Sequence, residues 1–385
     1  MNLLILVACF LTAFILRATV NWIDLIPWRK SVAAHWTERS RILWPVRNTD
    51  RFLGVCLPLL LATWSTFLCT ASTPQLLMRW AAAAVGACGA SWYLARQLRP
   101  EIHFHNWLHG VFFTCFLRFG IWIVFVFAST TMPKDFNLRT WITLGGMALL
   151  QVVWPTLALL LLRLLGTLKP PSARLREIVA GCERNNRPLV KNLWQARGIA
   201  ANAYALPLSG TLVFYDRLLE VLNDDEVAAI CHHELEHLAE SNWIILGRYL
   251  GAFAILPVLL VLPIFHRWEF LGVIGILMLM IVWARLAKKL IYQMEIRADA
   301  TASNQQAEQG VYAGTLETLY RESQLPAVTP GKHSTHPHLY DRMLAAGITP
   351  EYPRPRAPQK FTVLGWLVLI GCFIGYAAAL LTTSP

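Results

Sequence analysis

The sequence predicts a mainly α, polytopic membrane protein with about eight transmembrane helices and a small α+β domain on the cytoplasmic side. Three observations carry this prediction. Only 15% of the 385 residues are charged and 56% are hydrophobic, whereas an ordinary globular domain has about 25% charged residues. The apolar residues gather in long runs that are almost free of charge. A more polar segment near the middle of the chain interrupts these runs and carries both helix and strand patterns.

Eight apolar runs approach the length of about 20 residues that crosses a bilayer. The first contains Arg17 and Asn21, and it is expected to be retained because no basic residue precedes Leu3 and the run exceeds a signal-peptide core. Arg118 and Arg248 also lie inside runs, where a charge should face a partner or a wet cavity. The runs lie at about 2–26, 52–71, 76–95, 110–130, 141–165, 244–265, 270–287 and 361–382.

Lysine and arginine are concentrated between alternate runs, and this bias predicts the orientation. The segments 27–51, 96–109, 163–243 and 285–360 fall on the basic side, which is expected to be cytoplasmic. The short segment 27–51 gives the strongest indication, because it holds Arg29, Lys30, Arg39, Arg41, Arg47 and Arg51. The net charge of +11 is therefore mainly a topology signal. No nucleic-acid motif accompanies it, so no nucleic-acid partner is expected.

The cysteines do not predict a metal or disulfide framework. The chain has eight, most of them in apolar runs, where cysteine behaves as a small hydrophobic residue. No C-x-x-C pair occurs, so neither a zinc ribbon nor a disulfide scaffold is indicated.

The composition shifts along the chain suggest six regions. They are an N-terminal membrane domain of about five spans (1–166), a first soluble part (167–243), a transmembrane hairpin (244–287), a second soluble part (288–348), a Pro-rich linker (349–360) and a C-terminal span (361–385).

Local sequence patterns predict helices and a β-hairpin in the first soluble part. An amphipathic helix is expected from Ser172 to about Asn186, a β-hairpin around the Pro/Gly turn at 207–210, and a short helix from Asp216 to Val221. Asn223, followed three residues later by Glu226, predicts a capped helix that runs to about Glu240.

That capped helix contains His233-Glu234-Leu235-Glu236-His237, an H-E-x-x-H motif. Histidines four residues apart on a helix share a face, so both imidazoles can reach one zinc ion. Glu234 then lies beside the metal and could act as the general base on a zinc-bound water. The alternative is two surface histidines on a capped helix, but the position of the motif in the main soluble segment favours the metal site.

A hydrolytic zinc site needs three protein ligands and one open position. Glu295 is the best third ligand, because the pattern E-x-x-x-D places Asp299 one turn behind it. Asp299, one turn later, is placed to accept the free ring N–H of a ligating histidine. Glu240 is a rival third ligand, although three ligands from one helix cannot easily surround a metal.

The combination of His233-Glu-x-x-His237 with Glu295-x-x-x-Asp299, separated by a membrane hairpin, resembles the integral-membrane gluzincins. These include the type I CAAX prenyl proteases and the heat-shock-type membrane zinc proteases. The resemblance covers about 170–345 and implies a zincin-like catalytic domain with one Zn²⁺ per chain. Two departures are Glu236, where the family usually has a small residue, and Leu206-Pro207, where it has a glycine.

The resemblance also implies further site residues. Asn202-Ala203-Tyr204 is similar to the family's edge strand, which pairs with extended substrate. His336 and Arg342 are similar to its late H-P…R motif, in which the histidine assists catalysis and the arginine is expected at the substrate.

The expected function is a membrane zinc endopeptidase that cuts membrane-protein or lipid-anchored peptide substrates. His237 lies only about 10 Å along a helix from the sixth run, so the active site is expected at the cytoplasmic surface of a bacterial inner membrane. Two alternatives stay open: a signal-transducing receptor-protease that cuts a cytoplasmic regulator, and a non-enzymatic transporter with a metal site. The sequence indicates no oligomeric state.

Overall fold

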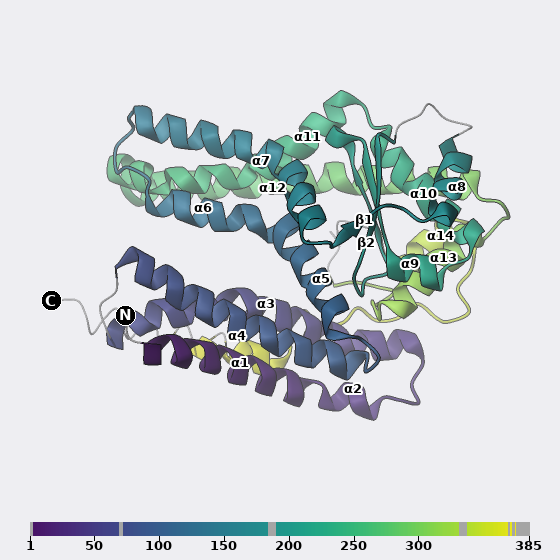
Figure 1. Ribbon diagram of the computed structural model, residues 1–385, viewed down its shortest axis with the longest axis horizontal. Coiled ribbons are helices and arrows are strands. Elements are labelled where there is room, and N and C mark those ends of the chain that lie inside the picture. The colour runs from purple at the N-terminus through teal and green to yellow at the C-terminus, as the bar shows by residue number, and fades with distance from the viewer. Residues whose placement is uncertain are drawn as a thin grey trace. The chain divides into compact units, whose positions relative to one another are not determined.

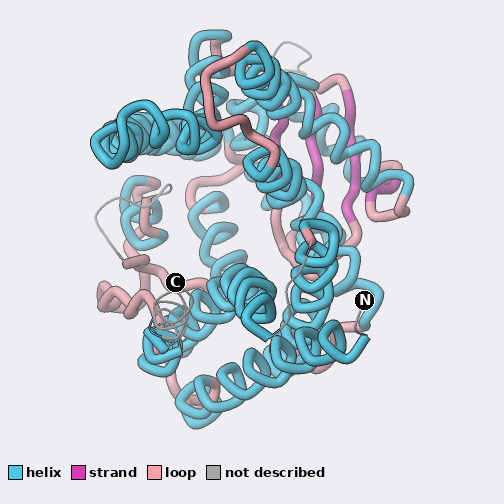
Figure 2. Tube along the Cα trace, turned by 90° about the vertical axis from the view of Figure 1, so that its left-hand side faces the viewer, coloured by secondary structure: helices cyan, strands magenta, loops and turns pink. Residues whose placement is uncertain are grey.

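The computed structural model describes residues 3–68, 72–183, 190–330, 337–368, 370, 371 and 374 (Figures 1 and 2). The chain forms two compact units. The first comprises Met1–Trp107, Tyr320–Gly331 and Tyr352–Pro385, and the second comprises Leu108–Leu319 and Lys332–Glu351. The predicted domain boundary at residue 166 stays a prediction. Phe113, Leu159 and Leu162 pack in one core with Val213 and Tyr215 of the sheet, which joins the helices after residue 107 to the soluble part.

The first unit is a helical bundle built from α1 (Leu3–Asp24), α2 (Ile26–Lys30), α3 (Trp36–Leu68) and α4 (Thr73–Leu98). Cys9 and Ala13 of α1 pack on Ala83 and Ala87 of α4, since small residues let helix backbones approach closely. The segment 27–51 was expected as a loop, but most of it is helical in α2 and the first turns of α3.

A buried ion pair joins three helices of this bundle. Arg17 donates from Nε and Nη2 to the two carboxylate oxygens of Asp50 at 2.7 Å each, and from Nη1 to the carbonyl oxygen of Ala87 at 2.7 Å. Asn21 donates to the same carboxylate at 2.7 Å. The charge predicted inside the first run thus has a partner on α3, as burial of an arginine among apolar helices requires.

The second unit begins with α5 (Phe104–Thr114), whose first residues lie before Leu108, and continues through a π-helical turn (Cys115–Phe119), α6 (Gly120–Thr130) and α7 (Leu138–Leu164). Later in the chain come α11 (Asn242–Ala252), the 3₁₀ helix η3 (Phe253–Leu260) and α12 (Val261–Gln305). In Figure 1, α6, α7 and α12 lie roughly parallel.

The stretch from α11 to α12 is a helical hairpin, as predicted. Trp283 of α12 donates from Nε1 to the carbonyl oxygen of Leu250 in α11 at 2.6 Å. A Cβ atom at Gly251 would lie 2.7 Å from the Cβ atom of Ala287, so the two helices are in close contact. The chain reverses at Glu269, whose φ of 49° interrupts the helical backbone.

Three helical stretches of the described chain are long and apolar enough to cross a membrane: Leu3–Lys30, Leu138–Leu164 and Asn242–Gln305. The third contains two of the predicted spans. The eight runs are therefore not all recovered as such helices. The stretch 110–130 is divided by the π-helical turn, α3 and α4 are less apolar than α1, and the last run lies mostly outside the described residues.

A four-stranded sheet forms the centre of the soluble part, in the order β1-β2-β4-β3. Its strands are β1 (Leu168–Lys169), β2 (Asn192–Ala196), β3 (Ala203–Leu206) and β4 (Thr211–Tyr215). The predicted hairpin is confirmed as the antiparallel pair β3–β4, with Gly210 at a φ of 57° ending the turn. Strand β2 pairs in parallel with β4, and the sequence reading missed it.

The shorter helices between residues 172 and 345 confirm most local predictions. They are α8 (Ala173–Glu183), α9 (Asp216–Val221), α10 (Asp224–Leu238), α13 (Val311–Glu322) and α14 (Leu339–Ala345). The side chain of Asn223 accepts from the Glu226 N–H, and the Glu226 carboxylate accepts from the Asn223 N–H, which completes the expected capping box. Residues 349–360 contain no helix or strand, as expected of a Pro-rich linker.

Candidate metal centre

Helix α10 presents both histidines of the motif on its buried face. His233 and His237 are each 8% exposed, and their rings lie 4.9 Å apart at nearly a right angle. Cys231, Leu235 and other apolar residues of α10 are also buried, so hydrophobic packing fixes the helix while the histidines point to one place. The four-residue spacing on a straight helix produces this convergence.

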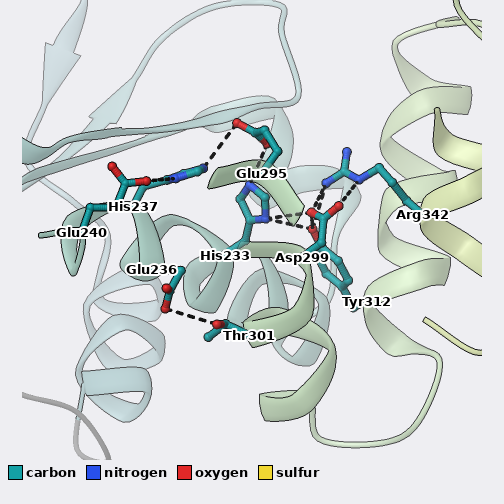
Figure 3. A network of polar contacts seen from close by, with 9 residues as sticks. All are labelled: His233, Glu236, His237, Glu240, Glu295, Asp299, Thr301, Tyr312 and Arg342. Atoms are coloured by element: carbon teal, nitrogen blue, oxygen red, sulfur yellow. Dashed lines mark hydrogen bonds and ion pairs between the residues drawn. The ribbon is translucent and has the colours of Figure 1, made fainter. Parts of the chain in front are cut away.

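Helix α12 brings Glu295 to the same place, as Figure 3 shows. Glu295 Oε2 lies 3.6 Å from His233 Nε2, and Glu295 Oε1 lies 3.6 Å from His237 Nε2. The three residues are buried, and one ligand atom from each falls within 4.8 Å of the others. Helices α10 and α12 pack directly on each other, which is how residues 58 positions apart in the sequence meet.

The geometry fits one zinc ion. Ligand atoms bound to tetrahedral zinc at about 2.0–2.1 Å lie about 3.4 Å from one another, close to the separations seen here. Both Nε2 atoms face the carboxylate, while each Nδ1 atom is engaged on the opposite side of its ring. Two imidazoles and one carboxylate are the ligand set of a catalytic zinc site, which leaves a position for water or substrate.

A polar network fixes the His233 ring. Asp299 Oδ1 lies 3.2 Å from His233 Nδ1, and the Tyr312 hydroxyl lies 2.9 Å from the same atom and donates to Asp299 at 2.6 Å. Arg342 donates from Nε and Nη2 to the two Asp299 oxygens, at 2.7 and 2.5 Å. The Asp299 carboxylate therefore faces His233 Nδ1, as the sequence predicts, and Arg342 forms an ion pair with it (Figure 3).

The same acids change the proton affinity of His233. Burial by itself lowers the pKa of His233, but the hydrogen bonds of Asp299 and Glu295 and the nearby charge of Glu234 outweigh burial and raise the pKa to about 9. In the metal-free protein these carboxylates thus favour the imidazolium. Zinc binds the neutral ring, so metal binding must release this proton.

A second carboxylate lies behind His237. Glu240 Oε1 is 3.2 Å from His237 Nδ1, and Glu240 Oε2 is 3.5 Å from Nη1 of Arg248 in α11. Glu240 was considered as a rival third ligand. The structure places it at Nδ1 of His237, away from the Nε2 atoms and outside the cluster of His233, His237 and Glu295.

The two remaining acids of the motif differ in position. Glu234 lies between His233 and His237 in the sequence, and its side chain is buried. At this position its carboxylate could accept a proton from a water on a bound metal. Glu236 accepts a hydrogen bond from the Thr301 hydroxyl at 3.2 Å. The departure from the family pattern at Glu236 thus makes a contact between α10 and α12 and does not face the ligand atoms (Figure 3).

The residues expected at the substrate are placed as follows. Ala203 and Tyr204 belong to β3, which lies at one edge of the sheet and contacts α10. Asn202 is exposed, and its carbonyl oxygen accepts from the Tyr215 N–H at 3.0 Å. The Tyr204 ring packs on Phe113 and Tyr215. These three positions at the sheet edge stay predictions as substrate contacts.

The late motif is only partly described. His336 lies outside the described residues. Arg342 is 9% exposed and contacts Asp299 and Tyr312, so its guanidinium contacts the metal site. Its expected role in binding substrate stays a prediction.

Sequence reasoning missed Tyr312 and gave Glu240 a different role. Tyr312 lies in an ordinary amphipathic helix, and nothing in its local pattern marks it. Glu240 was noticed, but as a ligand. Its position three residues after His237 was the available signal, because i and i+3 share a helix face.

Comparison with protein families agrees with this geometry. Residues 171–347 match the model of peptidase family M48. The match supports a metallopeptidase of this family. It covers just under half of the chain and contains His233, His237, Glu295, Asp299 and Arg342. M48 metallopeptidases usually bind zinc, which suits the cluster found here. No curated protein matches the chain.

Replacing Tyr312 with Phe tests the polar network around His233. The variant removes a hydroxyl in contact with His233, Asp299 and Arg342. We expect it to lower the free energy of unfolding by about 1–3 kcal/mol, because buried polar partners lose a hydrogen bond. Bound zinc should remain, since Asp299 still faces His233. Thermal unfolding in detergent and metal analysis measure both effects. Tyr320→Phe on the same helix is the control, and an unchanged unfolding midpoint for Tyr312→Phe would contradict the prediction.

Proposed function

We propose that this chain is a zinc-dependent endopeptidase, held in the membrane by about eight helices, with its active site at the cytoplasmic face. One observation carries the proposal. The Nε2 atoms of His233 and His237 both lie 3.6 Å from the carboxylate of Glu295, with Glu234 on the same helix as the histidines. This arrangement combines three zinc ligands with a base, and it suits peptide-bond hydrolysis.

The residues of the chain have distinct roles in such a reaction. Zinc, when bound by His233, His237 and Glu295, acidifies water and polarises the carbonyl group of a peptide bond. The Glu234 carboxylate accepts a proton from the attacking water and later delivers it to the leaving amine nitrogen. Asp299 accepts the Nδ1–H of His233, which keeps the Nε2 lone pair directed to the metal.

The position of the site suggests the class of substrate. Glu295 lies about 12 Å along α12 beyond the apolar run that ends near residue 287, at 1.5 Å per residue. A membrane hairpin therefore connects both halves of the site. Membrane proteins and lipid-anchored peptides can reach such a site from the bilayer. Strand β3 is an edge strand of the sheet and could offer backbone groups to an extended substrate segment, because strand addition is a common mode of peptide recognition.

Reconstitution in lipid vesicles tests this proposal. The full chain is inserted into vesicles with a membrane-tethered reporter and, in parallel, with the same cleavable peptide free in solution. We expect cleavage of the tethered reporter, loss of cleavage with a zinc chelator, and recovery on adding zinc. Cleavage that the chelator leaves unchanged would reject the zinc mechanism. Equal cleavage of the free peptide at matched bulk concentration would reject the proposed preference for membrane-held substrates.

A further inference from the structure

Behind the second ligand histidine lies a pair of charged residues that the proposed reaction does not use directly. The side chain of Glu240 is 1% exposed, and its two oxygens face different partners: Oε1 lies 3.2 Å from His237 Nδ1, and Oε2 lies 3.5 Å from Arg248 Nη1. Arg248 belongs to α11, inside an apolar run, where a charge needs a partner. We propose that Glu240 is the positioning residue for His237, and that Arg248 keeps the Glu240 carboxylate in place. The inference rests on the proposed zinc site.

Burial is the first reason for this assignment. A carboxylate that is removed from water is unfavourable unless a counter-charge or hydrogen-bond donors compensate it. Glu240 sits beyond the last turn of α10, which ends at Leu238, at the short connection to α11. A residue at a helix end has no need to be buried for helix stability. Its burial is explained if the His237 ring on one side and the Arg248 guanidinium on the other both interact with it.

The direction of the His237 ring is the second reason. An imidazole that binds a metal through Nε2 carries its proton on Nδ1, and an acceptor at Nδ1 fixes both the tautomer and the ring plane. Glu240 Oε1 occupies that acceptor position, while Nε2 of the same ring faces Glu295. The contact therefore selects the form of His237 that can bind the metal.

The other ligand histidine has the same kind of support. His233 Nδ1 faces Asp299, and Arg342 holds Asp299. His237 Nδ1 faces Glu240, and Arg248 Nη1 lies 3.5 Å from Glu240 Oε2, an ion-pair distance without a hydrogen bond. Each histidine thus has a carboxylate behind it and each carboxylate has an arginine, although the four residues come from different parts of the chain. The Arg248 contact also ties the metal helix to the first helix of the membrane hairpin.

The strength of zinc binding tests the proposal without measuring peptide cleavage. The zinc affinity of the full chain in detergent is determined by competition with a chromogenic chelator, and Co²⁺ is substituted to record the visible spectrum of the bound metal. Glu240→Ala should weaken zinc binding by about 10–100-fold, the usual effect of losing such a partner, and should change the Co²⁺ spectrum. Glu240→Gln retains an acceptor without the charge, so its loss of affinity should be smaller.

Variants of Arg248 and a matched control complete the test. Arg248→Met should weaken zinc binding in the same direction as Glu240→Gln, and Arg248→Lys should restore most of the loss. If Arg248 acts through Glu240, the double variant Glu240→Gln/Arg248→Met should bind zinc no more weakly than Glu240→Gln alone. Glu236→Gln makes the same chemical change on α10, at a residue that contacts Thr301, and should leave zinc affinity within two-fold.

The outcomes separate this inference from the proposed function. Zinc binding by the native chain, with Glu240→Ala and Glu240→Gln both within two-fold of it and unchanged Co²⁺ spectra, would overturn only the positioning role. If Glu240→Ala fails to fold, the isosteric variant Glu240→Gln and the variants Arg248→Met and Arg248→Lys test the positioning role. No zinc binding by the native chain would overturn the zinc site and this inference together. An equal loss of affinity in Glu236→Gln would also reject the assignment, because the effect would then belong to α10 in general.

Discussion

Replacing Glu234 with Gln is expected to abolish peptide hydrolysis and to leave zinc bound. The amide keeps the size of the side chain but cannot accept a proton from water at neutral pH. Loss of a general base lowers the rate by about 10²–10⁴-fold, so turnover should fall close to the background. The metal ligands are untouched, and metal analysis should still find about one zinc per chain, since a single cluster of three ligands is present among the described residues.

The neighbouring acid on α10 is the matched control for this experiment. Glu236→Gln makes the same substitution two residues further on, where the carboxylate accepts from Thr301. Its rate should stay near that of the native chain, and a small loss of stability is expected. Native activity in Glu234→Gln would exclude Glu234 as the base. Loss of zinc in that variant would show that the residue supports the metal site rather than the proton transfer.

Replacing Glu295 with Ala has the second largest expected effect, since it should release zinc and with it all activity. The carboxylate is the only contribution of α12 to the ligand cluster, and its two oxygens lie 3.6 Å from the two Nε2 atoms. Two histidines alone form an incomplete site. Metal content after dialysis should fall well below one per chain, and added zinc should restore little hydrolysis.

An exposed acid just beyond the same helix serves as the control. Glu308 lies after the end of α12 and is exposed, so Glu308→Ala should retain both zinc and activity. A variant Glu295→Ala that still holds one zinc per chain would reject Glu295 as a ligand. In that case the third ligand would have to come from another residue, and the arrangement of α10 and α12 would need a different explanation.

Much of the metal site can be predicted from the sequence, because its parts follow local rules. His233 and His237 converge through helical spacing alone, and Asn223 with Glu226 marks where that helix begins. Asp299 is found by the same spacing after Glu295. The hairpin at β3 and β4 follows from a turn between two extended runs. Each of these inferences concerns residues within a few positions of one another, where backbone geometry leaves few choices.

Contacts between segments that are far apart in the sequence could not be predicted. Tyr312 joins the site because α13 packs there, and its helix pattern is ordinary. Strand β2 pairs in parallel with β4 across an intervening segment, and a short run of five residues gives no signal for such a partner. The described chain contains three helical stretches that are long and apolar enough to cross a membrane, and the prediction of about eight spans stays a proposal. Apolar composition does not reveal the π-helical turn inside the run 110–130 or the partner that Arg17 finds in Asp50.

Glu240 and Arg248 show most clearly which features of the site depend on the tertiary structure and cannot be predicted from the sequence. The sequence by itself determined the H-E-x-x-H helix, its cap, the acid at Glu295 and the helical hairpin between them, since periodicity and spacing are properties of a single segment. Only the packing of α10 against α12 and the position of Glu240 after α10 decided which nitrogen of each histidine faces Glu295 and which faces a supporting carboxylate. The physical reason is burial: a charged group that is removed from water must have a partner within a few ångströms. No sequence pattern predicts which residue the fold brings close enough to be that partner.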